Sequence, residues 1–334
     1  MKARTQAMAP GTIPVRTAGI ILVFVLALSG CSLRRYAINQ IGNSLANSGT
    51  TFAADDDPEL VGGALPFSLK LMESVLAENP GHRGLLLATS SGFTQFTYVY
   101  VQQPADQLEG LDLKQCLALR ARARRLYLRA RDYGLRGLEL RHPGFTKAIH
   151  ESPRAAVERM GVADVPWLYW TAVAWGAAIS VSKDDPELIA DQTTVEALID
   201  RAATLDPNYD HGAIDSFLIT YESARQGAAG DFSTRSRRHF HRAVDLTEGK
   251  LAAPYLAMAE TVSIAKQDRQ QFESLLQQAL QVDVNARPEW RLSNIVMQRR
   301  ARWLLGRADE LFVESASAGP ARAPGYAISV QSQF

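Results

Sequence analysis

Apolar residues recur at alternating spacings of four and three along much of the chain, which is the period of an amphipathic α-helix. The clearest run is 117–141, LALRARARRLYLRARDYGLRGLELR. Its apolar stripe consists of Leu119, Ala123, Leu126, Ala130, Tyr133, Gly137 and Leu140. The small residues Ala123, Ala130 and Gly137 recur every seventh position, so we expect a neighbouring helix to approach closely there.

Eight arginines, from Arg120 to Arg141, lie on the other faces of this predicted helix. They form either a basic surface for an acidic partner or a solvated face whose aliphatic stems are buried. Of the two interpretations we favour the solvated face.

Helix boundaries are marked by a repeated motif. DDPEL occurs at 56–60 and again at 184–188, where an Asp can cap the helix, Pro suits the first helical position and Glu suits the positive helix end. Helix stops follow at Pro80, Pro143 and Pro207, at nearly even intervals. The even spacing indicates a duplicated helical unit.

Fragments of the tetratricopeptide pattern appear in the second half, for example Val195, Ile199, Ala202 and Pro207. Together with the absence of hairpin signals they predict an all-α, TPR-like α-solenoid of antiparallel helix pairs with extra long helices, over 55–313. The predicted helices are near 58–78, 82–102, 114–141, 153–160, 165–181, 187–205, 209–226, 231–247, 252–266, 269–281 and 288–313. The stretch 103–112 is a predicted linker, and 314–334 is a predicted irregular tail.

The segment 92–102, GFTQFTYVYVQ, has the aromatic and β-branched composition of a strand. Phe93, Phe96 and Tyr100 nevertheless fall on one helical stripe, and the segment starts soon after the stop at Pro80. We therefore predict a helix whose strand-like composition is overridden by tertiary packing.

The N-terminus has the pattern of a secretion signal. Basic residues precede an apolar run, 18–28, that spans only about 16 Å as a helix, and Leu-Ser-Gly-Cys31 follows it. This ending resembles a bacterial lipobox. It predicts a signal peptide at 1–30, acylation of Cys31 (palmitate included) and a flexible tether at 31–54, with a short helix near 34–46. Ser32 favours the periplasmic face of the outer membrane; the alternative is an ordinary secreted protein.

Charge and cysteine content bear on nucleic-acid binding and on disulfide formation. The formal net charge is +1, which gives no indication of nucleic-acid binding. Once Cys31 is acylated, Cys116 is the remaining cysteine, so no intramolecular disulfide can form. Its apolar neighbours predict that Cys116 is a buried core residue.

Catalytic and metal chemistry find little support. Glu151, in HESPRAAVERM, resembles the Glu-Ser motif of lytic transglycosylases, but the Gly-Leu-Met-Gln block of those enzymes is missing. Ser152 and Pro153 are simply typical of a helix start. His239 and His241 point to different sides of a helix and cannot share a metal ion. We predict no enzyme activity, no metal and no cofactor.

Aromatic residues crowd two predicted helices, 82–102 and 165–181. Any single ring has core packing as its simplest role, but two such segments cannot point every ring inward. Some rings should therefore line a groove, where aromatics supply most of the binding energy. The predicted lining set is Gln95, Tyr98, Trp170, Trp175 and Tyr221.

Three stretches carry a family resemblance: DDDPELVGGALPFSLKLMESVLAENPGHRGLLLATSSGFTQFTYVYVQ at 55–102, LYLRARDYGLRGLELRHPGF and VPWLYWTAVAWGAAIS. They resemble the T-component lipoproteins of TRAP transporters. The resemblance implies a periplasmic lipoprotein with cryptic tetratricopeptide-like motifs that associates with the solute-binding subunit. It also implies a homotrimer with a central pore and an accessory role in solute uptake.

The leading hypothesis is thus a lipid-anchored accessory protein that binds a TRAP solute-binding subunit and offers a groove or pore to a small apolar ligand. Two alternatives stay open. One is a lipoprotein scaffold for outer-membrane or envelope assembly. The other is a peptidoglycan lytic enzyme that uses Glu151.

Overall fold

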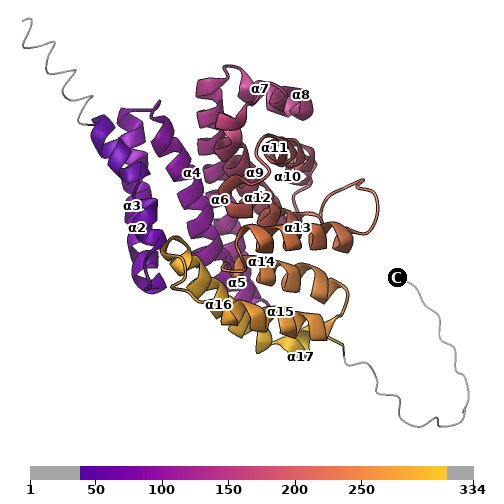
Figure 1. The fold of residues 1–334 in the computed structure, drawn as a ribbon. Coiled ribbons are helices and arrows are strands. Elements are labelled where there is room, and N and C mark those ends of the chain that lie inside the picture. The colour runs from indigo at the N-terminus through magenta and orange to yellow at the C-terminus, as the bar shows by residue number, and fades with distance from the viewer. Residues whose placement is uncertain (1–37, 314–334) are drawn as a thin grey trace, which may run out of the picture. The chain divides into compact units, whose positions relative to one another are not determined.

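The computed structural model describes residues 38–313 (Figure 1). The predicted signal peptide, Cys31 and the predicted tail at 314–334 lie outside the described residues. Within 38–313 the chain forms helices and turns without a strand, so the all-α prediction is confirmed.

The chain divides into two compact units, one up to Asp210 and one from His211 onward. The first unit begins with helical residues 38–46. Its next elements are α2 (Gly49–Ala53), α3 (Pro58–Glu78), α4 (Arg83–Thr97), the π-helical turn η1 (Tyr98–Gln102), α5 (Gln103–Leu108) and α6 (Leu113–Arg141). They are followed by α7 (Phe145–Glu151), α8 (Pro153–Val157), the 3-10 turn η2 (Val162–Asp164), α9 (Val165–Ser180), α10 (Pro186–Ala190) and α11 (Gln192–Leu205).

Helices of the first unit pack against one another in sequence order. α4 lies between α3 and α6, α6 packs against α9, and α9 packs against α11 (Figure 1). The core between them contains Leu85, Leu86, Leu168, Trp175 and Leu198, each with at most 1 % of its surface exposed. Cys116 is a buried free cysteine, as predicted.

Both DDPEL motifs start helices as predicted. The Asp57 carboxylate accepts hydrogen bonds from the backbone N–H groups of Glu59 and Leu60, each at 3.0 Å, and Pro58 is the first residue of α3. In the second copy the Asp185 carboxylate accepts from Leu188 N at 3.0 Å at the start of α10. The motif therefore satisfies backbone donors that a helix start leaves unpaired.

The strand-like segment 92–102 is helical, which confirms the prediction. Phe93 and Phe96 are buried, and the Tyr100 hydroxyl donates to the Pro58 carbonyl at 2.7 Å. The helix continues beyond it as α5, so the predicted linker at 103–112 is wrong for 103–108. Gln103 and Ala105 are buried because α5 packs on α6, a tertiary contact that sequence periodicity does not reveal.

Three further differences have local causes. The helix at 38–46 agrees with the short helix predicted near 34–46, but α2 is helical where a flexible tether was predicted. The helix α7 was not predicted because its seven residues are too few to show a period. The predicted helix at 187–205 breaks at Asp191, whose carboxylate accepts the indole N–H of Trp175 at 3.0 Å.

The small residues of α6 allow the close approach that their spacing predicts. Trp167 of α9 packs directly over Gly137: a Cβ at that position would lie 1.9 Å from Trp167 Cζ3. Gly134 faces Thr171 in the same way, with 2.2 Å between such a Cβ and the hydroxyl oxygen. Two glycines thus bring the backbone of α6 against the side chains of α9.

We expect Gly137→Ala and Gly63→Ala to change stability in opposite directions. Alanine gains up to about 1 kcal/mol of helix propensity at either site. At Gly137 the added methyl group meets Trp167, which is 5 % exposed and cannot move freely, and overpacking of this kind costs about 1–3 kcal/mol.

Gly63 is the matched control, because it lies within α3 with nothing within 4 Å of the added Cβ. Thermal unfolding followed by circular dichroism should therefore show a lower Tm for Gly137→Ala and an equal or higher Tm for Gly63→Ala. Shifts of the same sign would contradict the proposed contact between Gly137 and Trp167.

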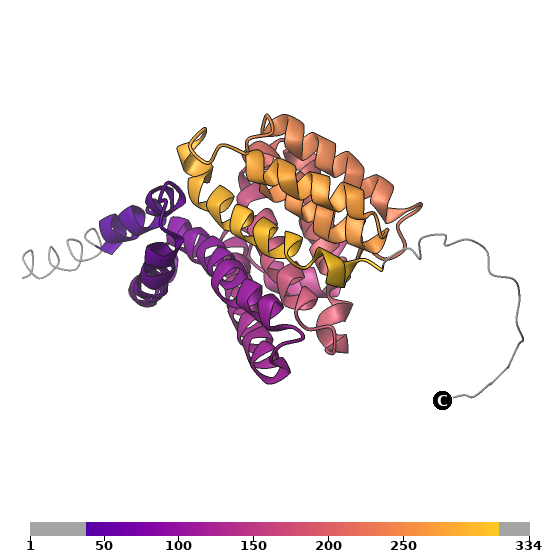
Figure 2. The same cartoon turned by 90° about the horizontal axis from the view of Figure 1, so that it is seen from below.

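The second unit consists of α12 (Tyr209–Tyr221, which begins at the unit boundary), α13 (Phe232–Leu246), α14 (Ala253–Met258), the π-helical turn η3 (Ala259–Ser263), α15 (Arg269–Gln281), the 3-10 turn η4 (Pro288–Trp290), α16 (Arg291–Leu305) and α17 (Ala308–Leu311). Consecutive helices from α13 to α16 pack side by side (Figure 2). Leu256, Phe272, Leu276 and Phe312 are in its core. Packing of neighbours in sequence is what helical repeats require, and a solenoid over the whole chain stays a prediction.

Candidate binding surfaces

The residues of the predicted aromatic groove have different environments. Gln95 of α4 is exposed, while Tyr98 of η1 and Trp170 of α9 are half-buried. Trp175 of α9 is fully buried, and Tyr221 is 8 % exposed. The first four belong to the first unit and Tyr221 to the second, so a groove shared by all five stays a prediction.

Trp175 is held on three sides. Its indole N–H donates to Asp191, the guanidinium carbon of Arg131 lies 4.8 Å from the ring centroid, and the His150 ring meets it edge-on at 5.5 Å. A cation over the indole face and a hydrogen-bonded N–H are the contacts by which a buried tryptophan is satisfied. Its ring therefore stabilises the first unit from within.

Trp170 belongs to a different cluster. Its ring lies 5.1 Å from Tyr169, and Tyr169 lies 5.3 Å from Tyr209. Burial raises the pKa of both tyrosine hydroxyls, and the Asp210 carboxylate adds to the shift. The three rings form one half-buried aromatic cluster in the first unit.

Tyr221 stacks on Phe217, one helical turn earlier in α12, with 5.2 Å between ring centroids. The Arg225 guanidinium lies over the same ring at 5.7 Å.

The outward face of α6 is basic along one side and apolar along the other. Arg122 and Arg125 are exposed and make no ion pair among the residues of 38–313. Leu117 is 54 % exposed, and Ala121 and Leu128 follow it four and eleven residues later, on the same side of the helix. We call these five residues the α6 face.

Other arginines of α6 are already paired. Arg120 binds Glu109 at 2.9 Å, Arg124 pairs with Asp185, and Arg141 binds Asp164 at 2.9 Å. The favoured interpretation, a solvated arginine face, thus describes only some of the eight arginines of α6.

Glu73 of α3 links α3 to α6. Its carboxylate accepts a hydrogen bond from the Tyr133 hydroxyl at 2.9 Å and another from Lys70. Burial opposes ionisation of Glu73, but the hydrogen bonds from Lys70 and Tyr133 and the nearby Arg129 lower its pKa. Burial and the Glu73 carboxylate raise the pKa of Tyr133 to about 12.

The helix α3 is apolar on two sides. One side packs on α4, and the other exposes Leu60, Phe67 and Leu71, at 63, 72 and 37 %. By length and composition alone α3 could cross a membrane. Only 22 % of its most apolar window is buried in the structure, so α3 is not a typical core helix. Exposed apolar stripes of this kind are typical of interaction surfaces.

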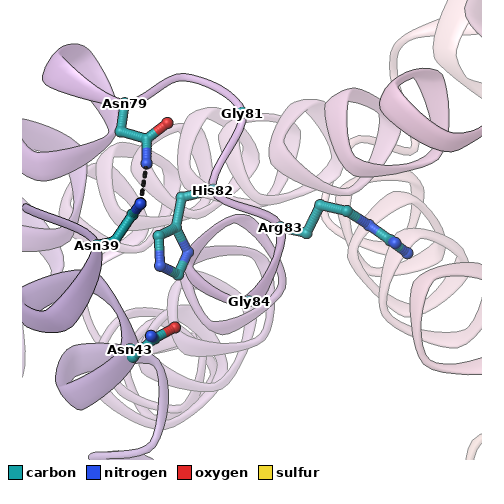
Figure 3. Close-up of a pocket in the computed structure, with 7 residues that line it drawn as sticks. All are labelled: Asn39, Asn43, Asn79, Gly81, His82, Arg83 and Gly84. Atoms are coloured by element: carbon teal, nitrogen blue, oxygen red, sulfur yellow. Dashed lines mark hydrogen bonds between the residues drawn. The ribbon is translucent and has the colours of Figure 1, made fainter. Parts of the chain in front are cut away.

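A polar pocket lies where residues 38–46 meet the turn between α3 and α4 (Figure 3). Asn39 and Asn79 are joined by a 2.6 Å hydrogen bond, His82 lies between Asn39 and Asn43, and Arg83 extends away. The His82 ring accepts a hydrogen bond from Leu85 N at 3.1 Å and so caps α4. These contacts hold residues 38–46 against the rest of the first unit.

A smaller pocket of about 200 Å³ lies at the C-terminal end of α6, where α7 and α8 follow. Arg141 Nε and His142 Nε2 lie 2.9 and 3.1 Å from the carboxylate of Asp164, which is 1 % exposed. Gly161 N also donates to this carboxylate, at 2.9 Å. The lining residues are Arg141, His142, Pro143, Phe145, Ala148, Ala156, Arg159 and Met160.

A buried ladder of charges joins α12 to α13 in the second unit. Asp215 of α12 is 5 % exposed, and Glu222, which directly follows the last residue of α12, is 4 % exposed. His239 contacts Asp215 at 2.7 Å and Glu222 at 3.9 Å, and Arg242 binds Asp215 at 2.9 Å. Arg225 and Arg235 both pair with Glu222.

His239 and His241 were considered as metal ligands, but both pack against other side chains. His239 is part of the ladder, and His241 packs beside Phe240 at 5.4 Å. Within 38–313 no group of three metal-ligating side chains occurs.

Glu151 is 65 % exposed at the end of α7, 3.7 Å from Lys147. Pro153 starts α8 as predicted, but the Ser152 hydroxyl makes no capping bond there, contrary to the prediction.

The two helical units, which contain no strand within 38–313, define the class as an all-α protein. The family described as TRAP transporter T-component matches residues 54–312, and this protein belongs to that family. It is a family of transport accessory components and not a known enzyme family. An uncharacterized protein of Treponema pallidum (strain Nichols) is 27 % identical over 90 % of this chain and 98 % of its own length.

Proposed function

We propose that this protein is a lipid-anchored accessory component of a TRAP solute-uptake system that docks the solute-binding subunit. The observation that carries the proposal is the family match across 54–312, which includes both helical units. Acylation of Cys31 would attach the chain to the periplasmic face of the outer membrane, in agreement with the lipobox-like Leu-Ser-Gly-Cys31.

The α6 face is the docking surface that we propose for this subunit. Arg122 and Arg125 offer unpaired positive charge, and Leu117, Ala121 and Leu128 offer apolar surface beside them. Arginine and apolar side chains are enriched where protein interfaces are buried, and complementary charge speeds association. The partner surface that fits is acidic with an apolar edge.

Two finer points follow from the family resemblance. We propose a homotrimer, for which the exposed apolar stripe of α3 is the best candidate contact, because interfaces between identical copies are more apolar than other interfaces. We also propose that a small apolar ligand is held in a groove or pore, with Gln95, Tyr98 and Trp170 as its accessible first-unit residues.

The test is binding of the full chain, in detergent, to the TRAP solute-binding subunit encoded in the same genome, measured by surface plasmon resonance. Arg122→Glu/Arg125→Glu should weaken binding tenfold or more at low salt, because it replaces two attractive charges by two repulsive ones. Light scattering on the same sample gives the number of copies.

The matched control is Arg237→Glu/Arg238→Glu, two exposed arginines of α13 without an ion pair among the described residues. It should leave the affinity within about twofold. Equal effects of the two double variants would exclude the α6 face as the docking surface. If the unchanged protein does not bind the subunit, the accessory role itself is wrong.

A further inference from the structure

The pocket at the C-terminal end of α6 has a polar half and an apolar half. Arg141, His142 and Arg159 contribute the polar half. The apolar half is formed by Pro143, Phe145, Ala148, Ala156 and Met160. Phe145, Ala156 and Met160 are 3, 6 and 2 % exposed, so this half is continuous with the core of the first unit.

The charges of the polar half do not cancel. The buried Asp164 carboxylate balances Arg141, with which it is in contact at 2.9 Å. Arg159 is exposed and has no ion pair among the residues that the structure describes, so its positive charge is left over. A guanidinium at the mouth of a partly apolar pocket favours a planar anion, because its N–H groups match a carboxylate in geometry.

The acidic side chains nearby are engaged elsewhere or point to solvent. The Glu139 carboxylate accepts the backbone N–H groups of Gly144 and Thr146, at 2.6 and 2.8 Å, and Glu151 lies 3.7 Å from Lys147. Glu158 is exposed, and its carbonyl oxygen accepts a hydrogen bond from Arg201 at 2.9 Å. None of the residues that line the pocket is acidic.

We propose that this pocket binds a small free monocarboxylate with a short apolar stem. The carboxylate contacts Arg159 at the mouth, and the stem lies against Phe145, Ala148 and Met160. The volume of about 200 Å³ accepts about six or seven non-hydrogen atoms, at roughly 30 Å³ for each water-sized group. The site goes beyond docking of the solute-binding subunit, since none of its lining residues belongs to the α6 face.

The probe is butanoate, observed by saturation-transfer NMR with the full chain in detergent. We expect saturable binding with a dissociation constant of about 1 mM, which is typical of so few contact atoms. 1-Butanol tests whether a charge is needed, butylammonium tests the sign of the charge, and acetate tests the apolar stem. Each should bind at least tenfold more weakly than butanoate. Equal binding of 1-butanol, or of acetate, would overturn the proposal.

Two variants test the site itself. Arg159→Ala should weaken butanoate binding about tenfold or more, as loss of a charge-assisted hydrogen bond does. Ala148→Leu should also weaken binding, because the larger side chain fills the apolar half. The matched control is Arg154→Ala, which removes an exposed arginine of α8 that does not line the pocket.

A melting curve for each variant ensures that the protein is folded. If Arg159→Ala and Arg154→Ala weaken binding equally, or if both folded pocket variants bind like the unchanged protein, the proposal is wrong. The last compound to be tested for binding is N-acetylglycine, which mimics the C-terminus of a peptide. Tighter binding of this compound than of butanoate would overturn the assignment to a free acid.

Discussion

Replacing Trp175 by alanine should destabilise the first unit by about 3–5 kcal/mol. The side chain is fully buried, and its removal leaves a cavity bounded by Arg131 and His150. It also leaves the Asp191 carboxylate without the indole donor that it has at 3.0 Å. The loss of apolar burial and the loss of a hydrogen-bond partner act in the same direction.

Trp170→Ala is the control, because the same residue type on the same helix is only half-buried. It should lower stability less. Urea unfolding gives the free energies, and amide hydrogen exchange assigns the change to a unit: exchange should rise in α9 and α11 and stay unchanged in α13 to α16. Equal stability of Trp175→Ala and the unchanged protein would show that Trp175 is not a core residue.

Replacing Glu222 by alanine should destabilise the second unit by about 3–5 kcal/mol, because it removes the buried carboxylate that pairs with both Arg225 and Arg235. Their side chains are 15 and 19 % exposed, so water can solvate them only in part. Arg235 would keep its hydrogen bonds to the carbonyl groups of Ala229 and Gly230, at 2.8 and 2.9 Å.

Glu310→Ala removes an equally charged but exposed partner, since Glu310 is 64 % exposed beside Arg307. A surface pair contributes about 0.2–1 kcal/mol, so the Tm should change little. Hydrogen exchange should rise in α12 and α13 for Glu222→Ala alone. A Glu222→Ala protein as stable as Glu310→Ala would mean that the ladder contributes nothing to folding.

Helix positions were predictable where local signals agree with packing. Asp57 with Pro58 and Asp185 with Pro186 start helices as their types dictate, and the small residues of α6 meet Trp167 as their spacing predicts. The predictions fail where one long-range contact decides. Burial of Ala105 continues the helix beyond Gln102, and the bond from Trp175 to Asp191 accompanies the break between α10 and α11.

The binding surfaces were harder to predict than the fold. Composition singles out aromatic residues, but it does not distinguish Trp175, held by Asp191 and Arg131, from the half-buried Trp170. The pocket beside Arg159 gave no sequence signal, because Phe145, Ala156 and Met160 resemble any core residues. The helix stop at Pro143 predicts a turn there but not that Pro143 lines a pocket.

If Cys31 is acylated as proposed, the hydrogen bond between Asn39 and Asn79 limits how far the first unit can lie from a membrane. A free tether over 31–54 could extend about 80 Å, whereas the stretch from Cys31 to residue 38 extends at most about 25 Å. With an acyl group on Cys31, the turn between α3 and α4 would thus be confined to a thin layer next to the bilayer. A solute-binding subunit would then have to approach the bilayer to within this layer to bind the first unit.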